Sequence, residues 1–492
     1  MAYYPEWAAS AFPPENIDFA RFDWIDFAFA VPTQNFGLGW DGDDDSADLL
    51  RRLVSAAHQN GKRVKLSVGG WTGSKYFSPA VSKPANRQTF VNSILAVYNQ
   101  FALDGIDIDW EFPAEDGNKG NIKSPNDTAN FLAFLQLLRK TLPQAAKISA
   151  ATMTVPWLDP QGNPSRDVSK FAGVLDWILV MNYDTWGSSS VPGPNAPLSN
   201  ACHNSTQSSA SAVAAVMSWT SAGFPASKIV MGVPSYGYIS RSGATNLMTR
   251  SFSRSKRAVP KHLPMHVDGA SQAASIADSE ANVSAVGEDS GDDPLAQMEG
   301  TKTGSSGSSS AFMVHNEDGG TDDGQVQFRD LVKQKVLQYL SAWSTSTRAA
   351  VAATVDDGES DDDSDGTQGD GGGGGAEQSN PEPSSNGDSG DSDDSGDPSQ
   401  AGVTSIAFAG QQIINVFNGQ NGFVRQWDAC SSTPYLRSAS ARQVITYDDP
   451  QSLEMKAVFV RAAGLLGVNL FDIHGDTDKW DLTDGIRRGL GL

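Results

Sequence analysis

Four acidic residues lie within eight positions of the segment DGIDIDWEFP, namely Asp104, Asp107, Asp109 and Glu111. The isoleucines and the tryptophan between them are typical of a buried strand. Like charges this close repel one another, and a buried charge without a partner costs several kcal/mol. Such a run is therefore expected only where the acids carry out chemistry.

Side chains alternate between the two faces of a strand, so Asp107, Asp109 and Glu111 share one face. Their Cα atoms are then roughly 6–7 Å apart along the row. A carboxyl group among other carboxylates and apolar walls has a raised pKa. Glu111, at the C-terminal end of the strand, can thus keep a proton near neutral pH and deliver it to a leaving group. The run predicts acid catalysis.

Metal binding is the main alternative, because calcium loops also place carboxylates at alternate positions. The calcium pattern needs a glycine at its sixth position and a glutamate at its twelfth, in a loop between helices, and this run does not match. The two cysteines, Cys202 and Cys430, are too few for a cysteine metal site and form either one disulfide or none. We expect no metal and no organic cofactor.

Short apolar runs alternate with amphipathic stretches through about residue 240, which predicts repeated βα units around a parallel sheet. Eight segments read as strands: 1–4, 22–30, 63–71, 105–110, 147–155, 177–184, 228–236 and 467–473. Three of the intervening stretches read as helices: 47–59, 88–101 and 129–143. Eight strands predict a (β/α)8 TIM barrel, an α/β fold whose active site lies at the C-terminal strand ends.

The composition changes after residue 240. We expect residues 1–240 to supply barrel strands one to seven. Residues 241–404 are predicted to be a long low-complexity insertion after strand seven, rich in Ser, Gly and Asp and largely disordered, with one helix at about 326–343. Residues 405–492 are expected to return to the barrel and supply strand eight.

The formal net charge of -22 argues against nucleic acid or an anionic membrane as a partner. The sequence contains no apolar run of about 18 residues, so we expect no membrane span. Its first residues, MAYYPEWA, do not read as a signal peptide. Sequons at Asn126, Asn204 and Asn282 are consistent with secretion, and we expect an extracellular protein.

The acid run resembles the signature of family 18 glycoside hydrolases, the retaining chitinases. That signature is Asp, two residues, Asp, one residue, Asp, one residue, Glu. Further matching segments follow in order: YYPEW, SVGGW, MNYDTWG, GVPSYG and YDDPQSLEMKAVFV. The resemblance covers about 1–240 and 405–475 and is nearest to fungal chitinases. It implies hydrolysis of β-1,4-linked N-acetylglucosamine polymers, with chitin or N-acetylglucosamine oligosaccharides as partners.

In such enzymes the substrate's own 2-acetamido oxygen attacks the anomeric carbon in place of an enzyme nucleophile. The resemblance makes Glu111 the proton donor and later the base. Asp109 would orient the acetamido N–H and stabilise the oxazolinium cation, and Asp107 would share a proton with Asp109. Tyr183 would hydrogen-bond the acetamido oxygen, and Asp184 would assist binding beside it.

Several further positions match the family's cleft and are expected to contact sugar rings, with packing in the core as the alternative for each: Met181, Trp71, Trp186 and Tyr236. The family usually has a tryptophan as the floor of the sugar site in the last strand, and Phe471 stands there. Tyr238 stands where an arginine is common. Structural roles are expected for four residues of the motifs: Asp104, Ser67, Gly69 and Gly70.

Many relatives carry a compact insertion domain after strand seven, where this sequence is of low complexity. We therefore expect a shallower cleft and endo cleavage. Two other functions fit the same barrel: an endo-β-N-acetylglucosaminidase acting on N-glycans, and a non-enzymatic chitin-binding lectin. Lectins of this kind typically lose the terminal glutamate of the run, which Glu111 retains.

Overall fold

A computed structural model describes residues 1–42, 45–247, 311–316, 323–340 and 405–492. Eight parallel strands form a closed barrel in the order β1-β18-β8-β7-β6-β5-β4-β2, and the pairing of β1 with β2 completes the circle. The strands are β1 Ala2–Pro5, β2 Trp24–Pro32, β4 Arg63–Gly69, β5 Gly105–Asp109, β6 Lys147–Thr152, β7 Trp177–Met181, β8 Ile229–Pro234 and β18 Gly467–Phe471. The predicted (β/α)8 barrel and all eight of its strands are confirmed.

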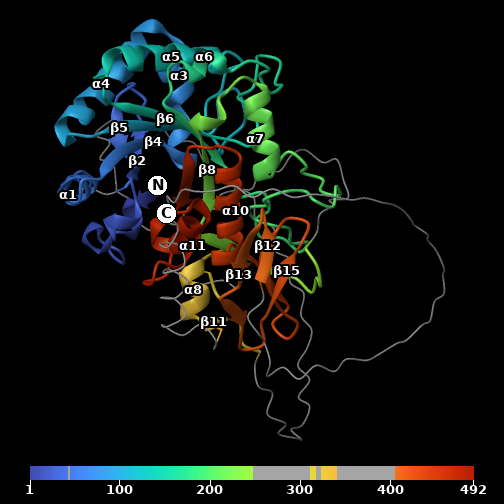
Figure 1. The fold of residues 1–492 in the computed structure, drawn as a ribbon. Coiled ribbons are helices and arrows are strands. Elements are labelled where there is room, and N and C mark those ends of the chain that lie inside the picture. The colour runs from blue at the N-terminus through green and yellow to red at the C-terminus, as the bar shows by residue number, and fades with distance from the viewer. Residues whose placement is uncertain (43–44, 248–310, 317–322, 341–404) are drawn as a thin grey trace, which may run out of the picture.

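Helices lie between the barrel strands and cover the outside of the sheet (Figure 1). The three predicted helices are confirmed as α1 Ser46–Gln59, α4 Pro84–Phe101 and α5 Asp127–Thr141. Further helices of the described chain, besides α8 below, are α2 Gly70–Gly73, α3 Phe77–Ser82, α6 Ser169–Ala172, α7 Ala212–Ser221, α10 Pro450–Ala462 and α11 Asp481–Leu490. Six short 3-10 turns are η1 Glu6–Ala8, η2 Pro14–Asn16, η3 Phe19–Arg21, η4 Ser74–Tyr76, η5 Ala226–Lys228 and η6 Ile473–Gly475. Among the described helices, none is both long and apolar enough to cross a bilayer.

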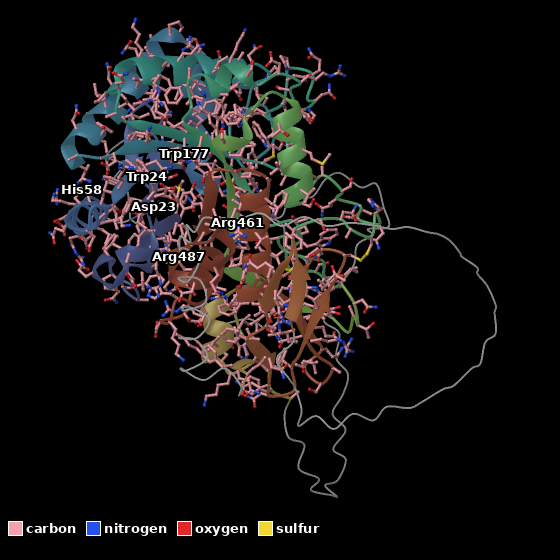
Figure 2. All side chains as sticks on the ribbon, viewed as in Figure 1. Asp23, Trp24, His58, Trp177, Arg461 and Arg487 are labelled. Carbon is pink, nitrogen blue, oxygen red and sulfur yellow. A yellow bond between two sulfur atoms is a disulfide. The ribbon has the colours of Figure 1, made fainter. Side chains whose placement is uncertain are left out.

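The core has two layers because the residues of each strand alternate in direction. Outward residues such as Ile106 and Ile108 on β5 are fully buried beneath the helices. A second cluster fills part of the barrel interior, where the rings of Trp24 and Trp177 meet edge to face at 5.5 Å (Figure 2). The alternation that buries the isoleucines outside the barrel is what directs the acids of β5 inside it.

A five-stranded antiparallel sheet is attached to the barrel, in the order β10-β9-β17-β16-β15. Its strands are β9 Tyr236–Arg241, β10 Gly324–Gln327, β15 Val424–Asp428, β16 Thr433–Ser438 and β17 Gln443–Thr446. From the sequence we expect low-complexity chain in place of the compact insertion domain of many relatives, whereas the described parts of that region contribute to this sheet. The strands are short and come from segments far apart in the sequence, so no local sequence pattern predicts that they pair.

The predicted helix at about 326–343 is also corrected. Helix α8 covers only Phe328–Lys333, and β11 Leu337–Tyr339 follows it, paired with β14 Phe417–Gly419. Lys335 between them has a positive φ of 57°, which ends the helix.

Residues 405–446 contribute β15, β16 and β17 to the attached sheet, and β12 Ser405–Phe408 and β13 Gln411–Ile414 form a separate two-stranded sheet. The chain then returns to the barrel through α10, β18 and α11. On the other side of the barrel, β3 Leu38–Trp40 pairs antiparallel with β2. Most of the predicted disordered insertion, at 248–310 and 341–404, lies outside the described residues.

The two cysteines form a disulfide, a question that the sequence left open. Cys202 lies in the long loop after β7 and Cys430 in the turn between β15 and β16, with their Cα atoms 5.1 Å apart. The backbone of the two segments also meets, since Ala201 N donates to Cys430 O at 3.0 Å and Leu198 N donates to Ser431 O at 2.9 Å. The disulfide therefore joins a barrel loop to the attached sheet.

Replacing both residues, Cys202→Ser with Cys430→Ser, is expected to lower the free energy of unfolding by about 2–4 kcal/mol, because a cross-link over so long a stretch restricts the unfolded chain. Urea unfolding of the oxidised wild type and of the double variant measures the difference. Equal midpoints would show that the backbone contacts alone hold the loop to the sheet.

Candidate active site

The three acids predicted to share a face lie together at the C-terminal end of β5, inside the barrel. Asp107 is 0% exposed, Asp109 3% and Glu111 6%. Asp104 lies at the opposite end of the strand, where its Oδ2 accepts a hydrogen bond from Val64 N at 2.8 Å. We refer to Asp107, Asp109 and Glu111 as the acid row.

Hydroxyl groups from three other barrel strands surround Asp107. Its Oδ2 accepts from Tyr3 Oη of β1 at 2.9 Å and from Ser67 Oγ of β4 at 2.8 Å. Its Oδ1 accepts from Ser149 Oγ of β6. All three contacts use the carboxyl group as an acceptor. Tyr3 and Ser149 were not among the predicted site residues, although Tyr3 lies in the matched segment YYPEW.

Asp109 has the opposite environment. Its Oδ1 is buried and has no hydrogen-bond partner among the described residues. Burial, and then the negative charges of Glu111 and Asp107, raise the pKa of Asp109 well above its usual value. Crowding therefore favours a bound proton on Asp109. The sequence places the retained proton on Glu111, and that remains a prediction.

The backbone around the acid row is closely packed. Gly69 ends β4 with φ at +122°, and a Cβ at this position would lie 2.0 Å from Asp109 O. Gly70 also has a positive φ and lies against the ring of Phe29. Ser74, which was not predicted, donates from Oγ to Gly70 O at 2.8 Å and accepts from Glu111 N at 2.9 Å. These contacts fix the backbone of β4 against that of β5 and Glu111.

Aromatic rings form a cluster beside the acid row. The ring of Phe471, at the end of β18, lies 5.3 Å from the ring of Tyr3 and 5.9 Å from that of Tyr183. Burial and then the charge of Asp109 raise the pKa of Tyr183 well above its usual value, so its hydroxyl remains a donor. The structure therefore brings Tyr183 and Phe471 together with the acids, as expected.

Asp184 follows Tyr183 with a positive φ of 57°. Its Oδ1 accepts from Tyr236 Oη at 2.8 Å and from Tyr238 Oη at 2.6 Å. Tyr236 is only 1% exposed, so its hydroxyl supports Asp184 from the interior. Tyr238, in the position where the family commonly has an arginine, supplies a second phenol.

The remaining predicted cleft residues also follow barrel strands at their C-terminal ends. Met181 is the last residue of β7, Trp71 follows β4, and Trp186 lies shortly after Asp184; all three are half-buried. The indole of Trp186 lies against Gly193, where an added Cβ would come within 2.3 Å of the ring. These side chains therefore lie at the same end of the barrel as the acid row.

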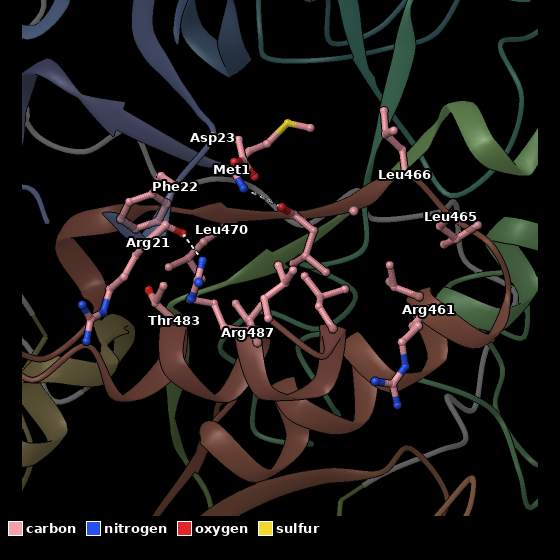
Figure 3. Close-up of a pocket in the computed structure, with 16 residues that line it drawn as sticks. Met1, Arg21, Phe22, Asp23, Arg461, Leu465, Leu466, Leu470, Thr483 and Arg487 are labelled. Carbon is pink, nitrogen blue, oxygen red and sulfur yellow. Dashed lines mark hydrogen bonds between the residues drawn. The ribbon is translucent and has the colours of Figure 1, made fainter. Parts of the chain in front are cut away.

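A cavity of about 320 Å³ lies at the other end of the barrel (Figure 3). Met1, Asp23 and Gly467, which lie at or just before the starts of strands β1, β2 and β18, line it together with Arg461 and Arg487. No residue of the acid row contributes to it. Within the described part of the chain, no group of three or more His, Cys, Asp or Glu side chains has the arrangement of a metal site. The candidate active site is therefore defined by the acid row.

The chain belongs to glycosyl hydrolases family 18, whose family model matches residues 1–476. A "chitinase-like effector" of Moniliophthora roreri is 44% identical over 240 residues, which are 48% of this chain and 58% of that protein. "Endochitinase 1" of Metarhizium robertsii is 34% identical over 194 residues, 38% of this chain and 43% of that protein. The matches thus span about half the length of these relatives. A class V chitinase from Nicotiana tobaccum, solved in complex with NAG4, shares the fold with a TM-score of 0.57 at 18% identity, covering 100% of this chain and 98% of that one.

Gly69→Ala is expected to destabilise the fold by about 3 kcal/mol or more, because the new Cβ combines an unfavourable φ with a collision against Asp109 O. Gly61→Ala is the matched control, since Gly61 also has a positive φ, of 68°, but no atom lies within 4 Å of an added Cβ. There we expect a loss of about 1 kcal/mol. Equal losses in urea unfolding would contradict the close approach of β4 to β5.

Asp109→Asn is expected to stabilise the protein at neutral pH. Because the pKa of Asp109 is raised, the folded state binds the proton more tightly than the unfolded state does. The bound proton therefore stabilises the wild type at low pH, and this contribution is lost as the pH rises through the pKa of Asp109. The variant should therefore exceed the wild type in free energy of unfolding at about pH 7, and the gap should shrink toward about pH 4. Asp116→Asn, at an exposed aspartate, is the control and should show no such gap. A gap that does not change with pH would contradict the prediction.

Proposed function

We propose that this protein hydrolyses β-1,4-linked N-acetylglucosamine polymers, namely chitin and its oligosaccharides, by a retaining, substrate-assisted mechanism. The observation that carries the proposal is the buried, unpartnered Oδ1 of Asp109 within the acid row. A buried acceptor without a donor is costly to maintain, and an amide N–H of the substrate would satisfy it. Membership of family 18 supports the same reaction.

In the first step, Glu111 donates its proton to the glycosidic oxygen and the bond to the anomeric carbon breaks. The 2-acetamido oxygen of the same sugar attacks that carbon and forms a cyclic oxazolinium ion. Asp109 accepts the acetamido N–H and stabilises the positive charge, while Tyr183 donates a hydrogen bond to the acetamido oxygen.

In the second step, Glu111 takes a proton from water, and the resulting hydroxyl attacks the anomeric carbon from the face that the leaving group occupied. The acetamido group is restored and the product keeps the β configuration. Asp107 shares the row's remaining proton with Asp109. Three hydroxyl donors hold the carboxyl oxygens of Asp107 in place beside Asp109.

The sugar would rest on the aromatic cluster beside the acids. Phe471 presents an aromatic face as the floor of the site, with less area than a tryptophan would offer. Trp71, Trp186 and Met181 are proposed to contact further sugar units, and Asp184, held by its two tyrosines, to assist binding next to Tyr183.

Endo cleavage and secretion are part of the proposal. The similarity to a protein named "Endochitinase 1" supports an endo mode, whereas the argument from a missing insertion domain no longer applies because the attached sheet is present. The disulfide between Cys202 and Cys430 supports an oxidising, extracellular compartment.

Chitin binding without hydrolysis is the second candidate function. A relative that is 44% identical over 240 residues is named "chitinase-like effector" and not chitinase, which keeps this candidate open. Retention of Glu111 within an intact acid row favours hydrolysis. An endo-β-N-acetylglucosaminidase would use the same acids on N-glycans, so substrate choice must be measured directly.

Glu111→Gln is expected to lower the rate of hydrolysis of N-acetylglucosamine oligomers by about 10³-fold or more, because the amide cannot act as an acid. Binding of the oligomers should persist. Glu15→Gln, at a surface glutamate that pairs with Arg52, is the matched control and should retain the wild-type rate. Early products of the wild type, read by NMR, should be β-anomers, with internal cleavage of long oligomers indicating endo action.

The outcomes separate the candidates. If the wild type and Glu111→Gln both bind the oligomers and neither cuts them, the acid row serves recognition and the chitin-binding function replaces the proposed one. If the wild type cuts only a high-mannose N-glycan, the glycan hydrolase is correct. Early α-anomers would overturn the substrate-assisted mechanism.

A further inference from the structure

A lysine side chain lies fully buried inside the barrel, next to the acid row. Lys65 comes from β4 and is 0% exposed. Barrel interiors are usually filled by branched apolar residues, and an ammonium group there costs several kcal/mol unless it is well paired. Its Nζ lies 3.2 Å from Asp26 Oδ1 and 3.8 Å from Asp107 Oδ1. A buried cation therefore stands between an acid of the row and an acid outside it.

The surroundings of Lys65 are shaped to hold it. Gly105 faces it from β5, and a Cβ there would lie 3.0 Å from Lys65 Cγ, so the glycine leaves room for the lysine stem. The ammonium lies 4.5 Å from the centre of the Trp177 ring, a cation–π contact.

A hydrogen-bonded chain also links the lysine to the acid row. Lys65 Nζ donates to Ser149 Oγ, which donates in turn to Asp107 Oδ1. The ammonium and the serine thus act on the same carboxylate oxygen, one directly by charge and the other by a hydrogen bond that the lysine orients.

Asp26 is the second partner of the lysine. It lies on β2, is fully buried, and accepts from Asn469 Nδ2 at 2.9 Å. Its Oδ1 is close enough to Lys65 Nζ for an ion pair. Burial raises the pKa of Asp26 to about 6 in spite of the lysine, and the charge of Asp107 contributes. One cation therefore serves two carboxyl groups that compete for it.

We infer that Lys65 is a positioning residue for the proposed reaction: its ammonium stabilises negative charge on Asp107 directly and through Ser149, and Asp26 weakens this effect by sharing the ammonium. Of the two carboxyl groups that share a proton in the proposed reaction, Asp107 and Asp109, the second is then favoured to hold it. This role of Lys65 rests on the proposed function. Lys65 is not among the residues proposed to touch the substrate, and it acts through Asp107.

The titratable and charged groups that act here come from several strands. They are the amino group of Met1 just before β1, Tyr3 on β1, Asp26 on β2, Lys65 on β4, Asp107 and Asp109 on β5 with Glu111 just after it, and Tyr183 after β7. Ser149 on β6, Trp177 on β7 and Asn469 on β18 complete the contacts without carrying charge. The amino group of Met1 acts on Asp26, and Lys65 is the cation placed directly against Asp107.

The inference predicts opposite shifts from two substitutions. Asp26→Asn removes the competing negative charge, so both limbs of the pH–rate profile for oligomer hydrolysis should move to lower pH. Lys65→Met in the Asp26→Asn background removes the cation, so both limbs should move back up by about one pH unit, the low end of the effect of a unit charge at 4–6 Å. In the double variant Asp26 is replaced by a neutral asparagine, so Asp107 is the only carboxyl group that loses its cation. The double variant is therefore expected to fold more readily than Lys65→Met alone.

Lys456→Met is the matched control. Lys456 is also 0% exposed and is paired with the buried Asp448, but it lies on α10 outside the barrel interior. This variant should lose stability while both limbs stay in place. The role of Lys65 would be purely structural in either of two cases. In the first, the limbs move to lower pH from the wild type to Asp26→Asn and again from Asp26→Asn to the double variant. In the second, the limbs move in neither comparison.

A second readout keeps this test separate from the proposed function. Titration of ¹³C-labelled aspartate carboxyls by NMR needs no turnover, and Asp107 should ionise at a pH about one unit higher in the double variant than in Asp26→Asn. If the wild type hydrolyses no oligomer, the proposed function fails while this titration still decides the role of Lys65. An unchanged Asp107 titration would overturn the inference even in an active enzyme.

Discussion

The burial of three carboxyl groups on the inner face of one strand is the constraint on which the rest of the site depends. Water would stabilise these groups if they were exposed, and inside the barrel the protein must replace it. For Asp107 it does so with three hydroxyl donors and a buried ammonium. For Asp109 it supplies no donor among the described residues, and burial with like charges raises the pKa instead. Asp107 and Asp109 therefore lie in unlike environments, and acid catalysis requires carboxyl groups whose environments differ in this way.

The backbone contacts serve the same end. Because Gly69 lies against Asp109 O, the ends of β4 and β5 approach more closely than side chains would allow. Ser74 then reaches the amide of Glu111 from the helical segment after β4. An acid that must meet a glycosidic oxygen within hydrogen-bond range needs a backbone without freedom to shift, since small displacements cost much of the rate.

The attached sheet and the aromatic cluster define how this site differs from a bare barrel. Tyr236 and Tyr238 both come from β9, the strand that joins the barrel to the sheet, and both donate to Asp184. Two neutral phenols hold this carboxyl group where the family commonly has an arginine, so its charge is stabilised without a neighbouring cation from that position. Cys202 and Cys430 connect the loop after β7 to the same sheet, and this places the sheet relative to the barrel.

The sequence by itself determined the barrel, its eight strands, and the shared face of Asp107, Asp109 and Glu111, because strand alternation and apolar runs are local patterns. Only the tertiary structure decided which groups surround those acids. Tyr3 and Lys65 reach Asp107 from other strands through the parallel register of the barrel, and no spacing within one segment encodes such a meeting. The attached sheet and the disulfide were missed or left open for the same reason, since their parts are joined by contacts across long stretches of chain.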